Sequence, residues 1–381
     1  MLMDPVVNKN AKFYIQIAKP TVEEEEKQAL IEVANRGWLS QGEKVYEFEK
    51  LISTAHGKKY GCACNSGAMA LILSLNAANI GHGDEVIIPD LTMIAVVNAV
   101  LAVGATPVFA DSSYTSDVGN IDKITIERCL TAKTRAIILV HTYGEAITSI
   151  QKIINFAHEK GLFVIEDCAE SHYAYDNENT MVGSAGDFAI FSFYSNKIIT
   201  TGEGGMVLTN CEDAKDRLDR LRMHCFTPGR HFWHTEQAWG VRMTDMQAAI
   251  GIVQHSKRHR FLARRKEIRK IYEENWKDNT TKKCNFANTQ KGATNWVLPI
   301  LTTNRENLRK HLAENGIDHR TYFNPFHKQE FLTKYSRGGN DSFYYYIAEN
   351  FGEKGLYLPI YPTLTNDEIL YICEKVNEFY A

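Results

Sequence analysis

The sequence predicts an α/β fold built around a mostly parallel β-sheet that helices cover on both faces. Short, continuous apolar runs recur along the first 250 residues, and helical patterns separate them. Strands buried on both faces read as such continuous runs, because crossover helices cover both sides of a parallel sheet. The chain has 381 residues, which leaves room for more than one domain. We expect a large domain over residues 1–250 and a smaller C-terminal α+β domain over residues 251–381.

The expected strands are short apolar runs rich in β-branched side chains. In chain order they are Lys59–Ala63, Asp84–Pro89, Pro107–Ala110, Arg135–His141, Leu162–Glu166, Phe188–Phe193 and Gly205–Thr209. Helical patterns cover Met69–Ala78, Met93–Val103 and Ile147–Lys160, and a long helix is expected over Met243–Trp276. Ligands of such sheets bind beyond the carboxyl ends of the strands, so functional residues are expected just after each strand.

The composition is that of an ordinary soluble globular protein. The formal net charge is −3, with 44% hydrophobic and 23% charged residues, so neither nucleic acid nor a membrane is an expected partner. The eight cysteines form no CxxC pair, and we expect reduced thiols and no metal site. No signal peptide or membrane-spanning run is visible, which favours a cytoplasmic location. The basic second half of the long helix is expected to be a solvated face.

A lysine stands just beyond a buried strand in the stretch Ser192–Gly205, which reads SFYSNKIITTGEGG. A lysine amine that is held desolvated can form a Schiff base with an aldehyde cofactor. The glycines that follow Lys197 allow the backbone to approach a flat ring closely. Taken alone, the same pattern also describes an exposed lysine before a turn.

Two acids, Glu166 and Asp167, end another buried strand. A carboxylate at such a place is costly unless it meets a cation, and the protonated nitrogen of a pyridine ring would supply one. A helix cap is the other interpretation.

A small-residue turn, Asn65–Ala68, lies between an expected strand and an expected helix. The start of a helix offers free amide donors and a positive dipole end to a phosphate, and Ser66 adds a hydroxyl. Simple capping of the helix explains the turn equally well.

Together, the three signals form a phosphate cradle, a pyridine acid and a Schiff-base lysine in the order that a pyridoxal-phosphate (PLP) transaminase needs. Nearly the whole chain resembles the DegT/DnrJ/EryC1/StrS family of nucleotide-sugar aminotransferases, which have the aspartate-aminotransferase-like fold (fold type I). The matching stretches are KPTVEEEE (Lys19–Glu26), GWLSQGEKVYEFE (Gly37–Glu49), NSGAMAL, GDEVIIPDLT, VHTYG (Val140–Gly144), EDCAESH, SFYSNKIITTGEGGM, RMTDMQAAIG (Arg242–Gly251), NPFH (Asn324–His327) and LPIYPTLT (Leu358–Thr365).

The resemblance implies a role for several residues of the cofactor site. Lys197 would carry pyridoxal 5'-phosphate and move the proton between cofactor and substrate, and Asp167 would pair with the pyridine nitrogen. Glu170 would lie beside the phenolic oxygen of the cofactor. The same resemblance implies that Gly67, Ala68 and Ser192 contact the phosphate and that Met93 covers the ring.

The resemblance also implies substrate contacts. Trp38 and Ser40, with Gln41, lie in a loop that the family places near the substrate, and Arg242 and His327 match further positions in or near the site. Core packing is the other interpretation of Trp38, and an ion pair that of Arg242. L-Glutamate is the implied amino donor, a nucleotide-linked keto sugar the acceptor, and a homodimer the implied assembly.

Glu170, with His172 two residues later, resembles the perosamine-synthase branch, which aminates C4 of a 4-keto-6-deoxy sugar. We therefore predict formation of a 4-amino-4,6-dideoxy sugar. A C3 aminotransferase acting on a 3-keto sugar and a catalytically silent PLP-binding regulatory protein are the alternatives. The dehydratase branch replaces the lysine with histidine, and Lys197 argues against it.

The chain departs from the family pattern at three cofactor positions. Ala68 replaces a threonine at the phosphate cradle, and Met93 stands where an aromatic residue is common. Gly240 occupies the position of an asparagine that reaches the phosphate of a neighbouring subunit in the family. The loss of one hydrogen bond typically costs about 0.5–1.5 kcal/mol, so weaker cofactor binding is expected.

Overall fold

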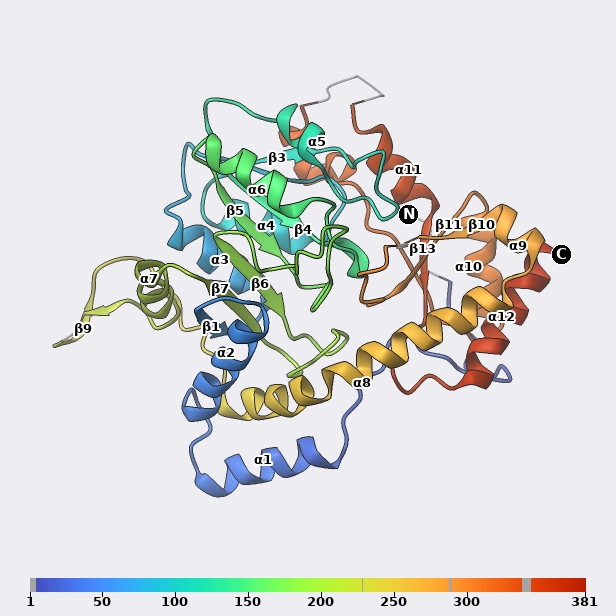
Figure 1. The fold of residues 1–381 in the computed structure, drawn as a ribbon, viewed down its shortest axis with the longest axis horizontal. Coiled ribbons are helices and arrows are strands. Elements are labelled where there is room, and N and C mark those ends of the chain that lie inside the picture. Colours follow the sequence, from blue (N-terminus) through green and yellow to red (C-terminus); the bar gives the residue numbers. More distant parts are fainter. Residues whose placement is uncertain (1–4, 228, 288–289, 338–343) are drawn as a thin grey trace.

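The computed structural model describes residues 5–227, 229–287, 290–337 and 344–381. Two main β-sheets organise these residues, and a long helix runs from one to the other (Figure 1). Within the described residues the larger sheet has seven strands in the spatial order β1-β7-β6-β5-β4-β2-β3. They are β1 (Tyr60–Cys64), β2 (Glu85–Pro89), β3 (Thr106–Ala110), β4 (Thr134–Val140), β5 (Phe163–Asp167), β6 (Phe188–Ser192) and β7 (Gly205–Thr209).

The larger sheet is parallel except at one strand. β7 pairs antiparallel with both β1 and β6, whereas β2, β3, β4, β5 and β6 pair in parallel. Almost every residue of these strands is buried, as expected for a sheet covered on both faces. The mostly parallel sheet predicted from the sequence is therefore confirmed.

Helices cover both faces of this sheet. One face carries α2 (Glu43–Ala55), α5 (Lys123–Glu127) and α6 (Ile150–Glu159), and the other carries α3 (Gly67–Ala77), α4 (Ile94–Ala102) and α7 (Glu212–Arg222). Successive side chains of a strand point to opposite faces. In β2, for example, Ile87 therefore packs in the first core and Val86 and Ile88 pack in the second.

The long helix expected from the sequence is α8 (Asp245–Asn275). Thr244 caps it, because its hydroxyl accepts from the amide of Gln247 at 3.2 Å. Much of its basic second half forms ion pairs. Lys257 contacts Glu23, Glu25 and Glu26 at 2.9, 3.0 and 2.8 Å, which ties α8 to α1 (Glu24–Arg36).

A smaller antiparallel sheet follows in the order β10-β11-β13-β12. Its strands are β10 (Cys284–Phe286), β11 (Leu298–Thr302), β12 (Arg320–Thr321) and β13 (Gly355–Leu358), and the helices beside them are α9 (Asp278–Lys283), α10 (Arg305–Glu314) and α12 (Asn366–Tyr380). Ile15, near the start of the chain, packs in this third core.

The remaining elements are η1 (Thr142–Gly144), η2 (Phe326–Lys328), η3 (Glu330–Tyr335) and α11 (Tyr346–Lys354). Phe326 and Leu332 pack in the core of the larger sheet, although they come late in the chain. Residue 250 lies inside α8. The division into domains of residues 1–250 and 251–381 stays a prediction.

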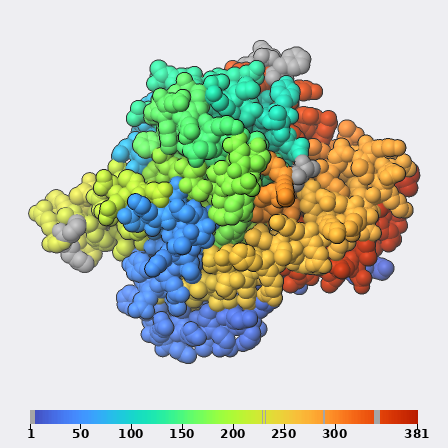
Figure 2. Space-filling view, in the orientation of Figure 1, coloured from blue at the N-terminus to red at the C-terminus, as the bar shows by residue number. Residues whose placement is uncertain are grey.

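A hairpin of β8 (Phe226–Thr227) and β9 (Arg230–His234) projects from the body of the protein (Figures 1 and 2). The sequence did not predict it. Phe232 and Trp233 on this hairpin are 74% and 56% exposed. Among the described helices, none combines the length and the apolar character that a membrane crossing requires.

Local backbone geometry moves some helix ends away from their expected positions. The helix expected over Ile147–Lys160 begins only at Ile150, because Ser149 adopts a left-handed conformation with φ 56°. Conversely, α3 begins at Gly67, two residues early, because the Ser66 hydroxyl accepts from the amide of Met69 at 3.2 Å and caps the helix there.

A buried ion pair ties α2 and α7 to β1, the edge strand of the larger sheet. Arg222 of α7 pairs with Glu49 of α2, and both side chains are almost fully buried. The carboxylate of Glu49 also accepts from the amide of Ala63 at 2.8 Å, and Arg222 donates to the Ala63 carbonyl at 2.9 Å. Two helices and strand β1 therefore share one charged contact.

We expect Glu49→Ala to lower the free energy of unfolding by about 3 kcal/mol, because the buried Arg222 charge then keeps only Asp219 as a carboxylate partner, at 2.8 Å. Urea unfolding followed by circular dichroism measures the change. The matched control is Glu24→Ala, which removes an exposed ion pair with Lys27 and should cost less than about 1 kcal/mol. Equal losses in the two variants would contradict the prediction.

Candidate active site

The predicted site residues come from loops at the carboxyl ends of neighbouring strands. The turn before α3 follows β1, Asp167 ends β5, and Ser192 ends β6 with Lys197 five residues later. Because β1, β5 and β6 point the same way in one sheet, these ends lie along one edge.

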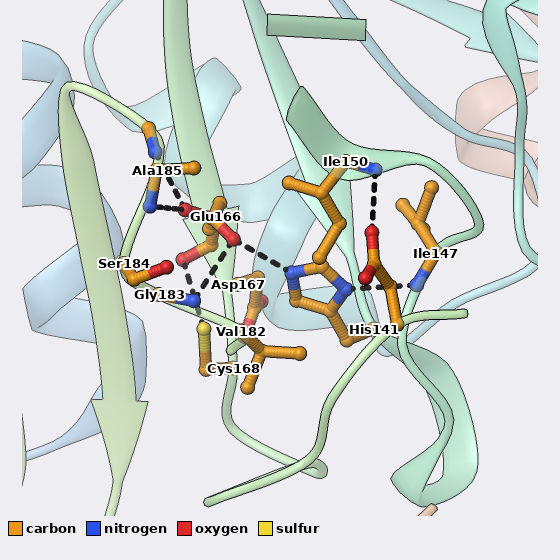
Figure 3. A network of polar contacts seen from close by, with 12 residues as sticks. His141, Ile147, Ile150, Glu166, Asp167, Cys168, Val182, Gly183, Ser184 and Ala185 are labelled. Carbon is orange, nitrogen blue, oxygen red and sulfur yellow. Dashed lines mark hydrogen bonds and ion pairs between the residues drawn. The ribbon is translucent and has the colours of Figure 1, made fainter. Parts of the chain in front are cut away.

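The two adjacent acids of β5 point to opposite sides of the sheet. Glu166 lies on the side of Val164, and its carboxylate accepts from the amides of Gly183, Ala185 and Gly186 at 2.8, 3.0 and 2.6 Å (Figure 3). A fourth donor is His141, whose Nε2 lies 3.2 Å from the carboxylate. Glu166 is thus occupied by the protein itself.

The tautomer of His141 follows from its second contact. The amide of Ile147 donates to His141 Nδ1 at 3.1 Å, so Nε2 carries the proton that is donated to Glu166 (Figure 3). Burial acts to raise the pKa of Glu166, but His141 and the amide donors outweigh it and hold this pKa below its ordinary value. Glu166 therefore remains a carboxylate at the centre of the sheet.

Asp167 has far fewer partners than its neighbour. The amide of Ala169 donates to its Oδ1 at 3.0 Å, and burial raises the pKa of the carboxyl to about 6 against the opposing effects of Ala169 and of the positive charge of Lys197. A buried carboxyl with a raised pKa is suited to a cationic ring nitrogen, which would restore its ionised form.

Two carboxyls act on Lys197 through their charge and not through direct contact. Although its side chain keeps some accessible surface, burial lowers the pKa of its amine, and the negative charges of Glu170 and Asp167 oppose that effect. The amine makes no hydrogen bond or ion pair with any other residue in the described ranges, but it lies 4.0 Å from the centre of the Trp296 ring. A desolvated amine of this kind can act as a nucleophile near neutral pH.

Glu170 is held by an unusual backbone turn. The amide of Tyr143 donates to its carboxylate at 2.8 Å, and Tyr143 itself adopts a left-handed conformation with φ 53°. The Tyr143 hydroxyl accepts from the amide of Phe323 at 2.8 Å, which ties the turn to the segment after β12. Burial raises the pKa of Glu170 to about 7, and the nearby Lys197 acts in the opposite direction.

The backbone at the start of α3 lies very close to the ends of β6 and β7. A side chain at Gly67 would place its Cβ 2.8 Å from the Cβ of Ser192, and one at Gly205 would place it 2.2 Å from the Ser66 carbonyl oxygen. Both positions therefore require glycine. The first amides of α3, the Ser192 hydroxyl and the positive end of the helix dipole form a cradle for an anion, to which the methyl group of Ala68 adds no donor.

The loop that contains Trp38 and Ser40 is fixed to the start of α8. The amide of Asp245 donates to the Ser40 carbonyl at 3.0 Å, and the Asp245 carboxylate accepts from the amide of Gly42 at 2.8 Å. Trp38 is 63% exposed, and its indole N–H donates to the Gln41 carbonyl at 2.9 Å. The exposed ring is not a core residue.

Arg242 lies next to the anion cradle. Its backbone pairs with Cys64 at the end of β1, and the amide of Asn65 donates to the Val241 carbonyl at 2.9 Å. Within the described residues its guanidinium makes no hydrogen bond or ion pair. Met93 precedes α4 after β2 and is 48% exposed.

His327 lies in a separate group of charged residues. Its Nδ1 is 2.6 Å from Asp90 and its Nε2 is 2.9 Å from Glu349, and its ring stacks on Tyr345 with the ring centres 4.4 Å apart. Burial acts to lower the pKa of His327, but the two carboxylates outweigh it and raise this pKa above its usual value. Both ring nitrogens are therefore already engaged.

The absence of a side chain at Gly240 has a local reason. A Cβ at this position would lie 2.5 Å from the imidazole Nε2 of His224, so the histidine occupies the space that a larger residue would need. His224 adopts φ 63°, which brings its ring to this place.

Sequence reasoning missed three residues around the lysine. Trp296 and Arg265 come from the second part of the chain, where no local motif marks them, and Tyr143 lies inside the quoted VHTYG stretch without a role assigned to it. The left-handed turn at Tyr143 precedes a glycine, which was the only local signal available.

Comparisons with known proteins agree with this geometry. Residues 20–377 match the DegT/DnrJ/EryC1/StrS aminotransferase family. The chain is 37% identical to a GDP-perosamine synthase of Escherichia coli O157:H7 over 97% of this chain and 99% of the relative. It is also 37% identical to a GDP-perosamine synthase of Caulobacter vibrioides, with 93% and 95% covered.

Among solved structures, the fold is similar to that of S. venezuelae DesV in complex with a ketimine intermediate. The TM-score is 0.85 at 29% identity, with 93% of this chain and 94% of the other covered. These findings confirm the predicted fold type I and the predicted cofactor. The chain therefore belongs to the DegT/DnrJ/EryC1/StrS aminotransferase family and is a pyridoxal-phosphate-dependent aminotransferase.

Proposed function

We propose that this enzyme transfers an amino group from L-glutamate to C4 of a nucleotide-linked 4-keto-6-deoxyhexose, which yields the 4-amino-4,6-dideoxy sugar. The observation that carries the transamination is the Lys197 amine, desolvated and flanked by the carboxyls of Asp167 and Glu170. The similarity to two GDP-perosamine synthases at 37% identity supports a nucleotide-linked sugar and the C4 position.

In this proposal Lys197 would hold the cofactor, and its amine would carry a proton to and from the substrate. The bound cofactor supplies an aldehyde and an electron-withdrawing ring that stabilises negative charge on the adjacent carbon. Burial favours the neutral amine that attacks a carbonyl, and the two nearby carboxyls favour the ammonium that returns a proton. One residue can therefore serve as base and as acid.

Asp167 and the start of α3 orient the cofactor. Asp167 would hold the proton on the ring nitrogen, because ionisation of this buried carboxyl is costly without a cation. The amides of Gly67 and Ala68 and the hydroxyl of Ser192 would hold the phosphate, and Met93 would cover the ring. A hydrogen-bonded phosphate and a paired ring nitrogen fix the position of the reacting carbon.

The substrate side of the site is also a proposal. Arg242 is suited to a phosphate of the nucleotide, because it lies beside the anion cradle. Trp38 and Ser40 would line the sugar path. His327 would also contact the substrate, and Asp90 and Glu349 would hold its ring in place. We also propose a cytoplasmic homodimer. In it, no side chain at the position of Gly240 would reach the cofactor phosphate of the neighbouring subunit, because the His224 ring occupies the space that such a side chain would need.

Lys197→Ala should abolish both halves of the reaction, with activity below about a thousandth of the wild type, because no other amine can replace the nucleophile. The loss of the cofactor's visible absorption band on addition of L-glutamate measures the first half. Lys50→Ala, an exposed lysine of α2, is the matched control and should react normally. Normal turnover by the Lys197 variant would refute the assignment.

The raised pKa of Glu170 predicts a pH-dependent stability in the cofactor-free protein. The folded pKa of about 7 exceeds the ordinary value of 4.5, so the contribution of Glu170 to stability is fully present below about pH 4.5 and is lost as the pH rises through 7. Glu170→Gln removes this loss. We expect the variant to be more stable than the wild type by up to about 3 kcal/mol at pH 8, with no advantage at pH 4.5. Urea unfolding at both pH values measures it, and a constant difference would contradict the prediction.

The choice of sugar position is tested with matched substrates. Purified enzyme loaded with the cofactor should aminate a GDP-linked 4-keto-6-deoxyhexose at least about a hundredfold more efficiently, in kcat/KM, than 3-keto nucleotide sugars, since a misplaced carbonyl loses alignment with the reacting carbon. Mass spectrometry of the amino sugar measures this. A preference for the 3-keto substrate would assign the enzyme to C3 amination, and reaction with neither would exclude the proposed acceptor.

A further inference from the structure

Trp296 is held rigidly beside Lys197. Its side chain is almost fully buried, and its indole N–H donates to the Asn196 carbonyl at 2.8 Å, the residue that precedes the lysine. A Cβ on Gly144 would lie 2.9 Å from the Trp296 amide nitrogen, so the neighbouring turn packs directly against it. The indole therefore cannot turn away from the lysine without breaking its hydrogen bond to Asn196.

A buried arginine fixes the backbone of Trp296. Nη1 of Arg265 donates to the carbonyls of Asn295, Trp296 and Ile360 at 3.2, 2.8 and 2.7 Å. Burial lowers the pKa of Arg265 to about 10, and its Nε has no partner within the described residues. The arginine, like Trp296 itself, contributes to the site from outside the larger sheet.

The face of the indole is the nearest partner of the amine. Lys197 Nζ lies 4.0 Å from the ring centre, inside the range of a cation–π contact. No carboxylate among the described residues lies within 4 Å of this nitrogen. Asp167 and Glu170 act on the amine only over a longer distance.

We propose that Trp296 is a positioning residue that holds the Lys197 amine and stabilises its ammonium form whenever the lysine is not bonded to the cofactor. This inference rests on the proposed role of Lys197. An indole face attracts an ammonium but offers no acceptor that would hold a neutral amine, so it retains the protonated lysine and releases the neutral one. Trp296 thereby opposes the effect of burial without adding a carboxylate that would compete with Asp167.

Other charged and titratable groups also surround this amine. Asp167 faces it from the end of β5, and Glu170 and His172 face it from the segment that follows. Lys19, Arg265 and Tyr361 line the small cavity that Lys197 shares. All of these groups stay unchanged when only residue 296 is replaced, so a difference between two variants at that position reports on the ring face.

The test measures the reactivity of Lys197 in the cofactor-free protein. Cyanate reacts only with the neutral amine, and peptide mass spectrometry follows carbamylation of each lysine from pH 6 to 10. The variants are Trp296→Phe, which keeps an aromatic face, and Trp296→Leu, which removes it and leaves similar space. If the Leu variant does not fold, Trp296→Met takes its place.

We expect the midpoint for Lys197 to lie at a lower pH in the Leu variant than in the Phe variant. At a fixed pH below the midpoint, the Leu variant should react about three- to tenfold faster. Equal midpoints in the two variants, or a lower one for Phe, would overturn the proposal. Lys58, a buried lysine that donates to the Gly186 carbonyl, should keep its rate in all variants and is the internal control.

A variant of a second buried tryptophan is the control for a general loss of packing. Trp276 is also buried and donates its indole N–H to a backbone carbonyl, that of Cys284 at 3.1 Å, but it lies in the core of the smaller sheet. Trp276→Leu should leave the Lys197 midpoint unchanged, and an equal shift there would also overturn the proposal.

A separate measurement tests the role of Lys197 itself. Borohydride reduction of the wild-type protein with bound pyridoxal phosphate, followed by peptide mapping, identifies the lysine that holds the cofactor. Labelling of another lysine would refute the proposed function. Labelling of Lys197 with equal midpoints in the Phe and Leu variants would refute only the role of Trp296.

Discussion

The arrangement of the site depends on one buried carboxylate, that of Glu166. It accepts from His141 and from three backbone amides of the loop between β5 and β6, so a single charge joins the end of β4, the end of β5 and the loop that leads to β6 (Figure 3). Each donor offsets part of the cost of burying the charge. These contacts hold the amino end of β6 beside β5.

The same contact leaves only one of two adjacent acids available to a ligand. Alternation along β5 puts Glu166 and Asp167 on opposite sides of the sheet. Glu166 is satisfied by the protein, whereas Asp167 accepts from one amide, that of Ala169, and has a pKa raised to about 6. Asp167 and Glu170, both short of positive partners, surround the amine of Lys197. A cationic cofactor would therefore stabilise the ionised form of these carboxyls.

The smaller sheet and its surroundings complete the site from the other side. Phe323 donates to the Tyr143 hydroxyl and so supports the turn that holds Glu170. Arg265 and Trp296 support the lysine from α8 and from the segment before β11. These contacts link residues that are 100 and 180 positions apart, and they make the relative placement of the two sheets part of the chemistry.

Much of the fold could be predicted from the sequence, and so could the grouping of the candidate cofactor residues along one edge of the sheet, because both depend on local patterns. Continuous apolar runs determine the strands of the parallel sheet, and strand-end motifs mark Asn65–Ala68, Asp167 and Lys197. Long-range packing decided the rest: Trp296 reaches Lys197, and His224 fills the space beside Gly240. No periodicity or motif encodes such contacts, since they exist only once distant segments have packed together.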